Sequence, residues 1–270
     1  MKSVLMTAVL GMFGATVAHA QTPGQTFGQN VLYHDGDTAL EGYLAVPPQA
    51  TAQTPVVLMA PAWMGITPTY TKRADDIART KGYVVFVADV YGKGVRPENR
   101  AQAASLSGHY KNDPEAFRQR MRAALQFIEQ QRHVTASQVA AIGFCFGGNA
   151  VLELARTGVK LAGVATFHGG LATAEPATAG AIHTPLLIMH GADDPFVNEA
   201  EVAGFENEMK ASGFTDWRLI EYGGAVHSFT DPEAGDDAAS GAAYNPAVAA
   251  KAFQELDGFL AHVFAKEDGK

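Results

Sequence analysis

The chain repeats one pattern of hydrophobicity, in which short, continuous runs of apolar residues alternate with longer stretches of helix-like sequence. Short apolar runs bounded by polar residues are typical of strands that are buried on both faces of a sheet. We assign strands to Pro55–Ala60, Tyr83–Val90, Gln138–Phe144, Leu161–Phe167, Pro185–His190 and Trp217–Tyr222. Helices are expected at about Tyr70–Lys81, Pro114–Arg132, Gly147–Thr157, Glu199–Ser212 and Pro246–Ala265.

Strands and helices that follow each other in this way indicate an α/β fold with a mostly parallel, twisted sheet and helices on both faces. A short hairpin is predicted before it, from Val31 through the turn Asp35-Gly36-Asp37 to a second strand at Ala39–Val46. The chain shows no internal repeat and no linker, and the Gly-, Ala- and Asp-rich stretch Asp231–Asn245 is expected to be a loop. We therefore predict a single domain over residues 31–265.

The first twenty residues are expected to be a signal peptide. Lys2 gives a positive start, Val4–Val17 is apolar and small, and Ala18-His19-Ala20 is an A-x-A cleavage site. The apolar run is shorter than the roughly 20 residues that a transmembrane helix needs. We predict a cleaved segment over 1–20, a flexible leader over 21–30, a periplasmic or secreted location, and no membrane span in the mature chain.

Charge and cysteine content narrow the possible partners. The chain has 20 Lys and Arg against 28 Asp and Glu, a formal net charge of −8, and no run of basic residues. This composition disfavours nucleic acids and anionic membranes as partners. Its single cysteine, Cys145, can form no intramolecular disulfide, although an exported protein reaches an oxidising compartment. The thiol is therefore either an inert core residue or a reactive group.

The residues around Cys145 favour the reactive group. Gly143-Phe144-Cys145-Phe146-Gly147-Gly148 lies between a predicted strand and a predicted helix, and matches the nucleophile elbow G-x-S-x-G with Cys in place of Ser. A sharp strand-to-helix turn brings the positions two before and two after the nucleophile together, so both need glycine. The helix N-terminus favours a thiolate. The spacing fits neither a P-loop nor a Rossmann turn.

Two further residues complete a catalytic triad in the chain order of hydrolases with this elbow, acid and then histidine. Asp194 follows the predicted strand that ends at His190, and His227 follows the one that ends at Tyr222. Side chains at the carboxyl ends of parallel strands meet at one edge of the sheet. Asp193 is an alternative to Asp194 for orienting the histidine.

The other histidines at strand ends suit structural roles. His190 is expected to pack in or near the core, and His168 to stabilise a loop, where it could line the pocket. A metal site built from His168, His190 and His227 lacks any ligand spacing of the H-x-x-x-H type. We predict no metal.

At these residues the chain resembles the dienelactone hydrolase family, over roughly Leu40 to Phe264. The matching segments are Gly143–Gly148, Asp89–Gly92, Gly191–Val197 and Ala225–Phe229. The resemblance implies a compact α/β-hydrolase fold and hydrolysis of an ester or lactone through a thioester intermediate, without a cofactor. It also implies a small-molecule substrate, and we expect the protein to act as a monomer.

The sequence departs from the founding members of that family at three positions. Ala62 stands where they carry a Glu that contacts the Cys. Lys93 and Asp231 stand where they carry two arginines that bind the carboxylate of the substrate. Hydrolysis of dienelactone itself is therefore not implied, although Lys93 is retained as a candidate substrate-binding residue.

The predicted mechanism uses Asp194 to orient His227 and His227 to deprotonate Cys145. The oxyanion would be bound by the backbone N–H groups of Phe146 and Trp63, and the Trp63 side chain would form a wall of the substrate pocket. The alternative is a non-catalytic binding protein of the same fold. A thiol redox protein is disfavoured, because the chain has no resolving cysteine.

Overall fold

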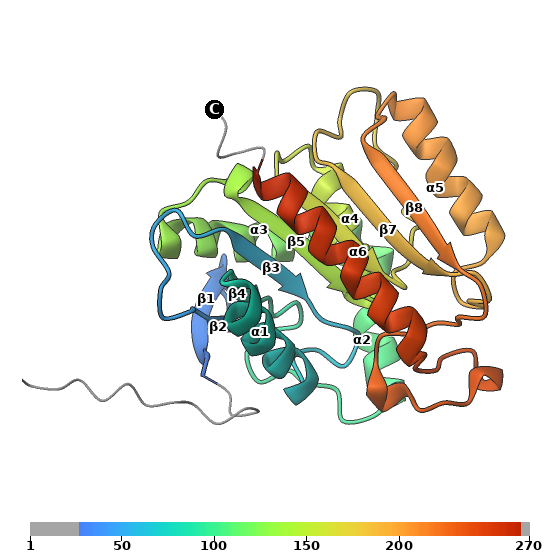
Figure 1. Cartoon of the computed structure of the whole chain (residues 1–270), viewed down its shortest axis with the longest axis horizontal. Helices are drawn as coiled ribbons and strands as arrows, with labels where there is room; N and C mark the ends of the chain where they lie inside the picture. Colours follow the sequence, from blue (N-terminus) through green and yellow to red (C-terminus); the bar gives the residue numbers. More distant parts are fainter. Residues whose placement is uncertain (1–26, 266–270) are drawn as a thin grey trace, which may run out of the picture.

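A computed structural model describes residues 27–265. Its core is one eight-stranded sheet in the order β1-β2-β4-β3-β5-β6-β7-β8 (Figure 1). The strands are β1 (Gln29–Asp35), β2 (Thr38–Ala45), β3 (Val56–Ala60), β4 (Val84–Val87), β5 (Val139–Phe144), β6 (Gly163–Phe167), β7 (Leu186–Gly191) and β8 (Trp217–Tyr222). The pairs from β4 to β8 are parallel, whereas β2 runs antiparallel to both of its neighbours, β1 and β4. The predicted mostly parallel sheet of a single α/β domain is confirmed.

Helices cover both faces of this sheet (Figure 1). The helices are α1 (Pro68–Lys81), α2 (Arg100–Asn112), α3 (Pro114–Arg132), α4 (Phe146–Arg156), α5 (Glu199–Ser212) and α6 (Pro246–Ala265), with short 3-10 helices η1 (Ala136–Gln138), η2 (Pro232–Ala234) and η3 (Ala238–Ser240). The apolar sides of α1 and α6 share one buried cluster with one face of the sheet. Those of α3, α4 and α5 share a second cluster with the other face. This double cover explains why strands β3 to β7 are buried at every position and mostly apolar.

Helix α2 is the main element that the hydrophobic pattern did not predict. Its sequence is rich in Ala, Ser and Gly, and it buries only Ala103, Ser107 and Tyr110. A helix with so narrow an apolar face gives little periodic signal. A capping signal is nevertheless present, because the Asn99 side chain accepts a hydrogen bond from the Gln102 N–H (3.0 Å).

The N-terminal boundary of the domain lies slightly earlier than predicted. Strand β1 begins at Gln29, inside the segment 21–30 that was expected to be a leader. Before it, the N–H groups of Phe27 and Gly28 donate to the carboxylate of Asp75 on α1 (3.1 and 3.2 Å). The predicted signal peptide and the leader up to residue 26 lie outside the described residues. Among residues 27–265, no helix is long and apolar enough to cross a membrane.

Candidate active site

Cys145 lies on a strained turn between β5 and α4. Its φ is +52°, a left-handed value that non-glycine residues rarely adopt. A Cβ at Gly143 would lie 2.1 Å from the carbonyl oxygen of Gly147, and a Cβ at Gly147 would lie 2.1 Å from that of Ala60. Both positions are therefore restricted to glycine by backbone contacts, as the elbow pattern predicts. The turn places Cys145 at the N-cap position of α4.

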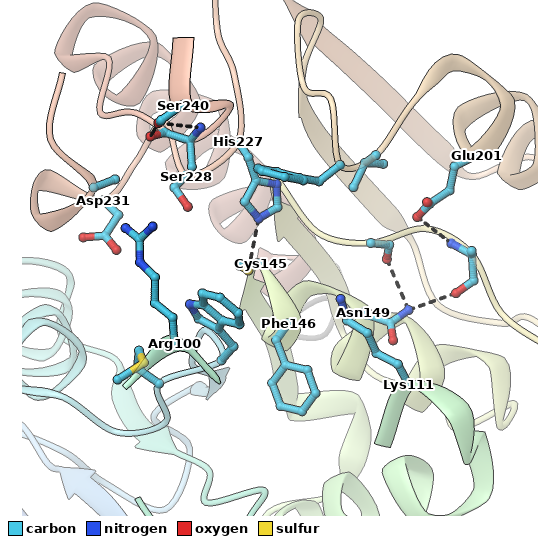
Figure 2. A pocket seen from close by; sticks show the side chains of 18 of the residues that line it. Arg100, Lys111, Cys145, Phe146, Asn149, Glu201, His227, Ser228, Asp231 and Ser240 are labelled. Carbon is cyan, nitrogen blue, oxygen red and sulfur yellow. Dashed lines mark hydrogen bonds between the residues drawn. The ribbon is translucent and has the colours of Figure 1, made fainter. Parts of the chain in front are cut away.

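The structure brings Cys145, His227 and Asp194 together from three loops at the carboxyl ends of β5, β8 and β7. The Nε2 of His227 lies 3.1 Å from the Sγ of Cys145 (Figure 2). Its Nδ1 lies 2.7 Å from the Oδ2 of Asp194. The three side chains thus form one hydrogen-bonded chain in which each ring nitrogen has its own partner, the geometry of a nucleophile, a base and an orienting acid.

Asp194 rather than Asp193 provides that carboxylate. Asp193 is exposed, whereas the carboxylate of Asp194 is buried. The Oδ1 of Asp194 accepts hydrogen bonds from the N–H groups of Phe196 and Val197 (2.8 and 3.2 Å), which leaves Oδ2 for His227. The carboxylate is therefore fixed on one side by its own loop and faces the imidazole with the other.

The electrostatics of the site favour a thiolate and an imidazolium. Burial by itself raises the pKa of the Cys145 thiol, but the charge and hydrogen bond of His227, helped by Lys111 and the Phe146 N–H, outweigh it and lower that pKa below its ordinary value. Burial opposes the imidazolium of His227, but the sulfur of Cys145 and the hydrogen bond to Asp194 outweigh it and raise the pKa of His227 to about 10. Each partner stabilises the charged form of the other.

A cavity of about 740 Å³ opens over Cys145 and His227. Trp63 and Phe146, the two residues predicted to supply N–H groups to the oxyanion, both line it. Trp63 is fixed by its carbonyl oxygen, which accepts a hydrogen bond from the Tyr91 hydroxyl (2.7 Å). Phe146 begins α4, and its ring stacks on Phe117 with centroids 4.7 Å apart.

The structure does not bring Lys93 to this cavity, which corrects its predicted role in substrate binding. Lys93 is exposed, and its N–H donates to the carbonyl oxygen of Ala39 (2.9 Å), so its turn lies over the β1–β2 hairpin. Asp231, the second departure from the family pattern, does line the cavity. The cationic side chains of the lining are instead Arg100 and Lys111, besides His227.

Arg100 and Lys111 come from the two ends of α2, the helix that the hydrophobic pattern missed. Arg100 extends toward Asp231 on one side of Cys145 (Figure 2). Lys111 lies on the other side, near Asn149, and Glu201 lies beyond it (Figure 2). The lining thus has a cation and a carboxylate on each side of Cys145 (Figure 2). The capping residue Asn99 is a signal in the sequence that predicts a helix carrying both cations. No signal in the sequence predicts that this helix reaches the site.

His168 and His190 are both buried behind the triad. The Nε2 of His168 lies 2.8 Å from the Oγ1 of Thr230, and its ring contacts that of His227 edge to face, with centroids 5.3 Å apart. Burial is the main reason that the pKa values of both histidines are lowered. Over residues 27–265, no group of three or more His, Cys, Asp or Glu side chains has the arrangement of a metal site.

Known proteins match this chain over most of its length. The sequence profile of the dienelactone hydrolase family matches residues 40–264. A Bradyrhizobium protein described as a "probable 2-oxo-3-(5-oxofuran-2-ylidene)propanoate lactonase" is 29% identical over 206 residues, which cover 72% of this chain and 80% of that protein.

Solved structures also match. A dienelactone hydrolase-like promiscuous phosphotriesterase from metagenomic libraries is 34% identical, with a TM-score of 0.79 over 88% of this chain and 98% of the other. A dienelactone hydrolase from Anabaena variabilis shares the fold at 20% identity, with a TM-score of 0.62 over 87% of this chain and 97% of the other. The chain belongs to the dienelactone hydrolase family of α/β proteins and is a hydrolase of carboxylic esters or lactones.

Proposed function

We propose that this hydrolase works by covalent catalysis, with Cys145 as nucleophile, His227 as base and Asp194 as the residue that orients His227. The observation that carries the proposal is the hydrogen-bonded chain from Sγ to Nε2 (3.1 Å) and from Nδ1 to Oδ2 (2.7 Å), at the floor of a cavity. Three residues separated in sequence acquire in this way the mutual geometry of an acyl-transfer site.

The reaction follows from the roles of these groups. The thiolate of Cys145 attacks the carbonyl carbon, and the electron pair of the C=O bond moves to oxygen. We assign the binding of that oxyanion to the backbone N–H groups of Phe146 and Trp63, because both residues line the cavity over Cys145. Collapse of the tetrahedral intermediate expels the alkoxide, which takes a proton from the imidazolium of His227, and leaves a thioester. Neutral His227 then deprotonates a water, whose attack releases the acid and restores the thiolate.

Ala62 makes His227 more important in this chain than in the founding members of the family. No carboxylate stands at position 62 to compete with the thiolate for its positive partners. The imidazolium of His227, the nearby ammonium of Lys111 and the N-terminus of α4 remain as the groups that favour ionisation of Cys145.

The test is turnover of p-nitrophenyl esters and of small lactones. We expect Cys145→Ala to lose on the order of 10³-fold or more of kcat. Wild type mixed with a slowly hydrolysed ester should show a mass increase equal to one acyl group on the peptide that contains Cys145. The Cys145→Ser variant should retain little activity. Near-normal turnover by Cys145→Ala would refute the nucleophile, and no turnover by wild type would favour a binding protein of the same fold.

A second activity is supported by the 34% identical structure described as a promiscuous phosphotriesterase. We propose that the thiolate of Cys145 also attacks phosphorus in neutral phosphotriesters, with expulsion of an aryloxide, and that water then cleaves the S–P bond. Release of p-nitrophenol from an aryl dialkyl phosphate by wild type but not by Cys145→Ala would support this activity. A single stoichiometric burst without turnover would contradict it.

The cell compartment is also a proposal. We propose that Met1–Ala20 is removed on export to the periplasm or the outside of the cell, because residues 1–20 have the pattern of a signal peptide. We also propose that the exported protein acts as a monomer. Mass spectrometry of the exported protein should find Gln21 at its N-terminus. An intact Met1–Ala20 segment on exported protein would contradict the proposal.

A further inference from the structure

His168 is a buried histidine at the end of β6 that contacts the loop of His227. It follows β6 directly, is 1% exposed, and has a positive φ of +41°. Its N–H donates to the carbonyl oxygen of Met189 on β7 (2.8 Å), which fixes it at the carboxyl end of the sheet. Its ring contacts His227 with centroids 5.3 Å apart, and Phe229 with centroids 5.0 Å apart. The imidazole of His227 is therefore packed on one side against that of His168.

The same histidine holds the loop at a second point, Thr230. The Nε2 of His168 lies 2.8 Å from the Oγ1 of Thr230, and both residues are buried. The carbonyl oxygen of Thr230 also accepts a hydrogen bond from Arg73 on α1 (3.0 Å). The segment that follows His227 is thus tied to the end of β6 and to α1. Asp194 fixes the imidazole at Nδ1, whereas these contacts fix the backbone that carries it.

The surroundings of His168 require an uncharged ring. Its Nδ1 has no hydrogen-bond partner within the described part of the chain. A second proton would put a charge on a fully buried ring, which is unfavourable even though a hydrogen bond to the backbone of His168 itself would favour that proton. Burial, then the positive charges of His227 and Arg73, hold the pKa of His168 well below its ordinary value, and His190 acts in the same direction. The neutral ring then shares a hydrogen bond with the Thr230 hydroxyl through its Nε2.

We propose that His168 is a positioning residue for His227: its neutral ring, hydrogen-bonded to Thr230, holds the imidazole of His227 against Cys145 and keeps a second positive charge away from it. The inference rests on the triad proposed above. His168 does not line the cavity over Cys145, so it acts through His227 and not on the substrate.

The experiment compares Thr230→Val and His168→Phe with wild type. Thr230→Val keeps the shape of the side chain and removes the hydrogen-bond partner, while His168→Phe keeps an aromatic ring and removes both nitrogens. Two quantities are measured, the pH midpoint of Cys145 alkylation by iodoacetamide and the values of kcat and KM for an ester. We expect both variants to raise the midpoint by about half a pH unit or more, because a displaced imidazolium stabilises the thiolate less. We expect kcat to fall about tenfold, with KM nearly unchanged.

Thr184→Val is the matched control. Thr184 is also fully buried, and its hydroxyl donates to the carbonyl oxygen of Val159 and accepts from the N–H of Leu161 (2.7 and 3.0 Å), beside the amino end of β7. The Thr184→Val variant should lower the midpoint of thermal unfolding without changing the pH midpoint of alkylation or kcat.

Wild-type values of the alkylation midpoint and kcat in folded Thr230→Val would overturn the inference, even if its thermal stability fell. Thr230→Val leaves the His168 ring in place and nearly preserves the shape of residue 230, so the test stays decisive if His168→Phe fails to fold. The proposed triad is judged separately by His227→Ala. If that variant leaves the alkylation midpoint of Cys145 unchanged, the triad itself has been misassigned, whatever the Thr230→Val variant shows.

Discussion

At the scale of single residues, the reactivity of Cys145 depends on opposing effects on its ionisation. Burial opposes a thiolate, and the imidazolium of His227 at 3.1 Å favours it. The lowered pKa of Cys145 means that the thiolate is present above that pKa and is lost as the pH falls through it. The raised pKa of His227, about 10, means that the imidazolium is lost only as the pH rises through about 10. The ion pair therefore exists between these two limits.

The first prediction tests this pairing by alkylation. Because Cys145 is the single cysteine of the chain, iodoacetamide incorporation reports on it alone. Wild type should react readily at mildly acidic pH, where an ordinary thiol with a pKa of about 8.5 is protonated. His227→Ala should move the midpoint upward, because the buried sulfur loses its main positive partner. Coinciding profiles for the two proteins would show that His227 does not activate Cys145.

At the scale of elements, the elbow and α2 contribute to the site in different ways. The elbow is determined by short-range sterics, since the start of α4 can approach β5 only with glycine at position 143, and the end of β3 only with glycine at position 147. Helix α2 is held by few buried residues, yet its two ends bring Arg100 and Lys111 to the lining of the cavity on opposite sides of Cys145. Substitutions in the elbow should therefore affect folding, and those on α2 mainly the chemistry.

Gly147→Ala tests the elbow. A Cβ at this position would lie 2.1 and 2.5 Å from the carbonyl oxygens of Ala60 and Pro61, which belong to the backbone and cannot move aside easily. We expect a loss of at least about 2 kcal/mol in the free energy of unfolding and a large loss of activity. Gly204→Ala on α5 is the control, because a Cβ there meets nothing within 4 Å. It should stabilise the protein by about 0.5–1 kcal/mol. Equal stability of the two variants would contradict the steric account.

Lys111→Gln tests the contribution of α2 to the charge at Cys145. The ammonium of Lys111 lowers the pKa of Cys145, after the larger effect of His227. Its removal should raise the midpoint of alkylation, by less than His227→Ala does. The difference from wild type should shrink in high salt, because Lys111 is exposed and its field is screened. Lys72→Gln, an exposed lysine paired with Asp76 on α1, should leave the midpoint unchanged. A salt-independent shift would argue against a direct electrostatic effect.

At the scale of the whole molecule, one wall of the cavity depends on an ionic network below it. The connection from β6 to β7 has no helix, and Gly170, Ala172, Thr173 and Ala174 from it line the cavity. Arg156 on α4 donates to the carbonyl oxygen of Leu171 (2.7 Å) and to both carboxylate oxygens of Glu208 on α5 (2.8 and 2.7 Å). The Glu208 carboxylate also accepts from the N–H of Ala177 (2.8 Å). Two helices thus hold the connection in place.

Glu208→Ala tests this network. The substitution removes the bidentate partner of the buried Arg156 guanidinium, which keeps Glu153 (2.9 Å) as its remaining carboxylate. We therefore expect a loss of about 3 kcal/mol in the free energy of unfolding measured with urea. The KM for esters should rise as the wall loosens. Glu255→Ala removes the partner of Arg218 in an exposed pair and should change stability by less than about 1 kcal/mol. Similar effects of the two substitutions would mean that burial of the network contributes little.

The sequence by itself determined the α/β class, the parallel strands and the elbow, since each rests on local rules. Buried strands need apolar residues at every position, and a tight turn needs Gly143 and Gly147 wherever it occurs. The sequence also predicted that Cys145, Asp194 and His227 lie close together, because each follows a strand and the ends of these strands meet at one edge of the sheet. It did not predict α2, and it placed Lys93 in the pocket by analogy with other members of the family.

Only the tertiary structure decided which side chains surround the triad. The contact of His168 with Thr230 joins residues 62 positions apart, and that of Arg156 with Glu208 joins residues 52 apart. Neither pair leaves a periodic or local signal in the sequence, because each residue alone is compatible with many partners. Helix α2 is placed by packing on its neighbours rather than by its own weak apolar face. The cations and positioning groups of the site are therefore set by contacts between distant segments, which exist only once the sheet has brought its strand ends together.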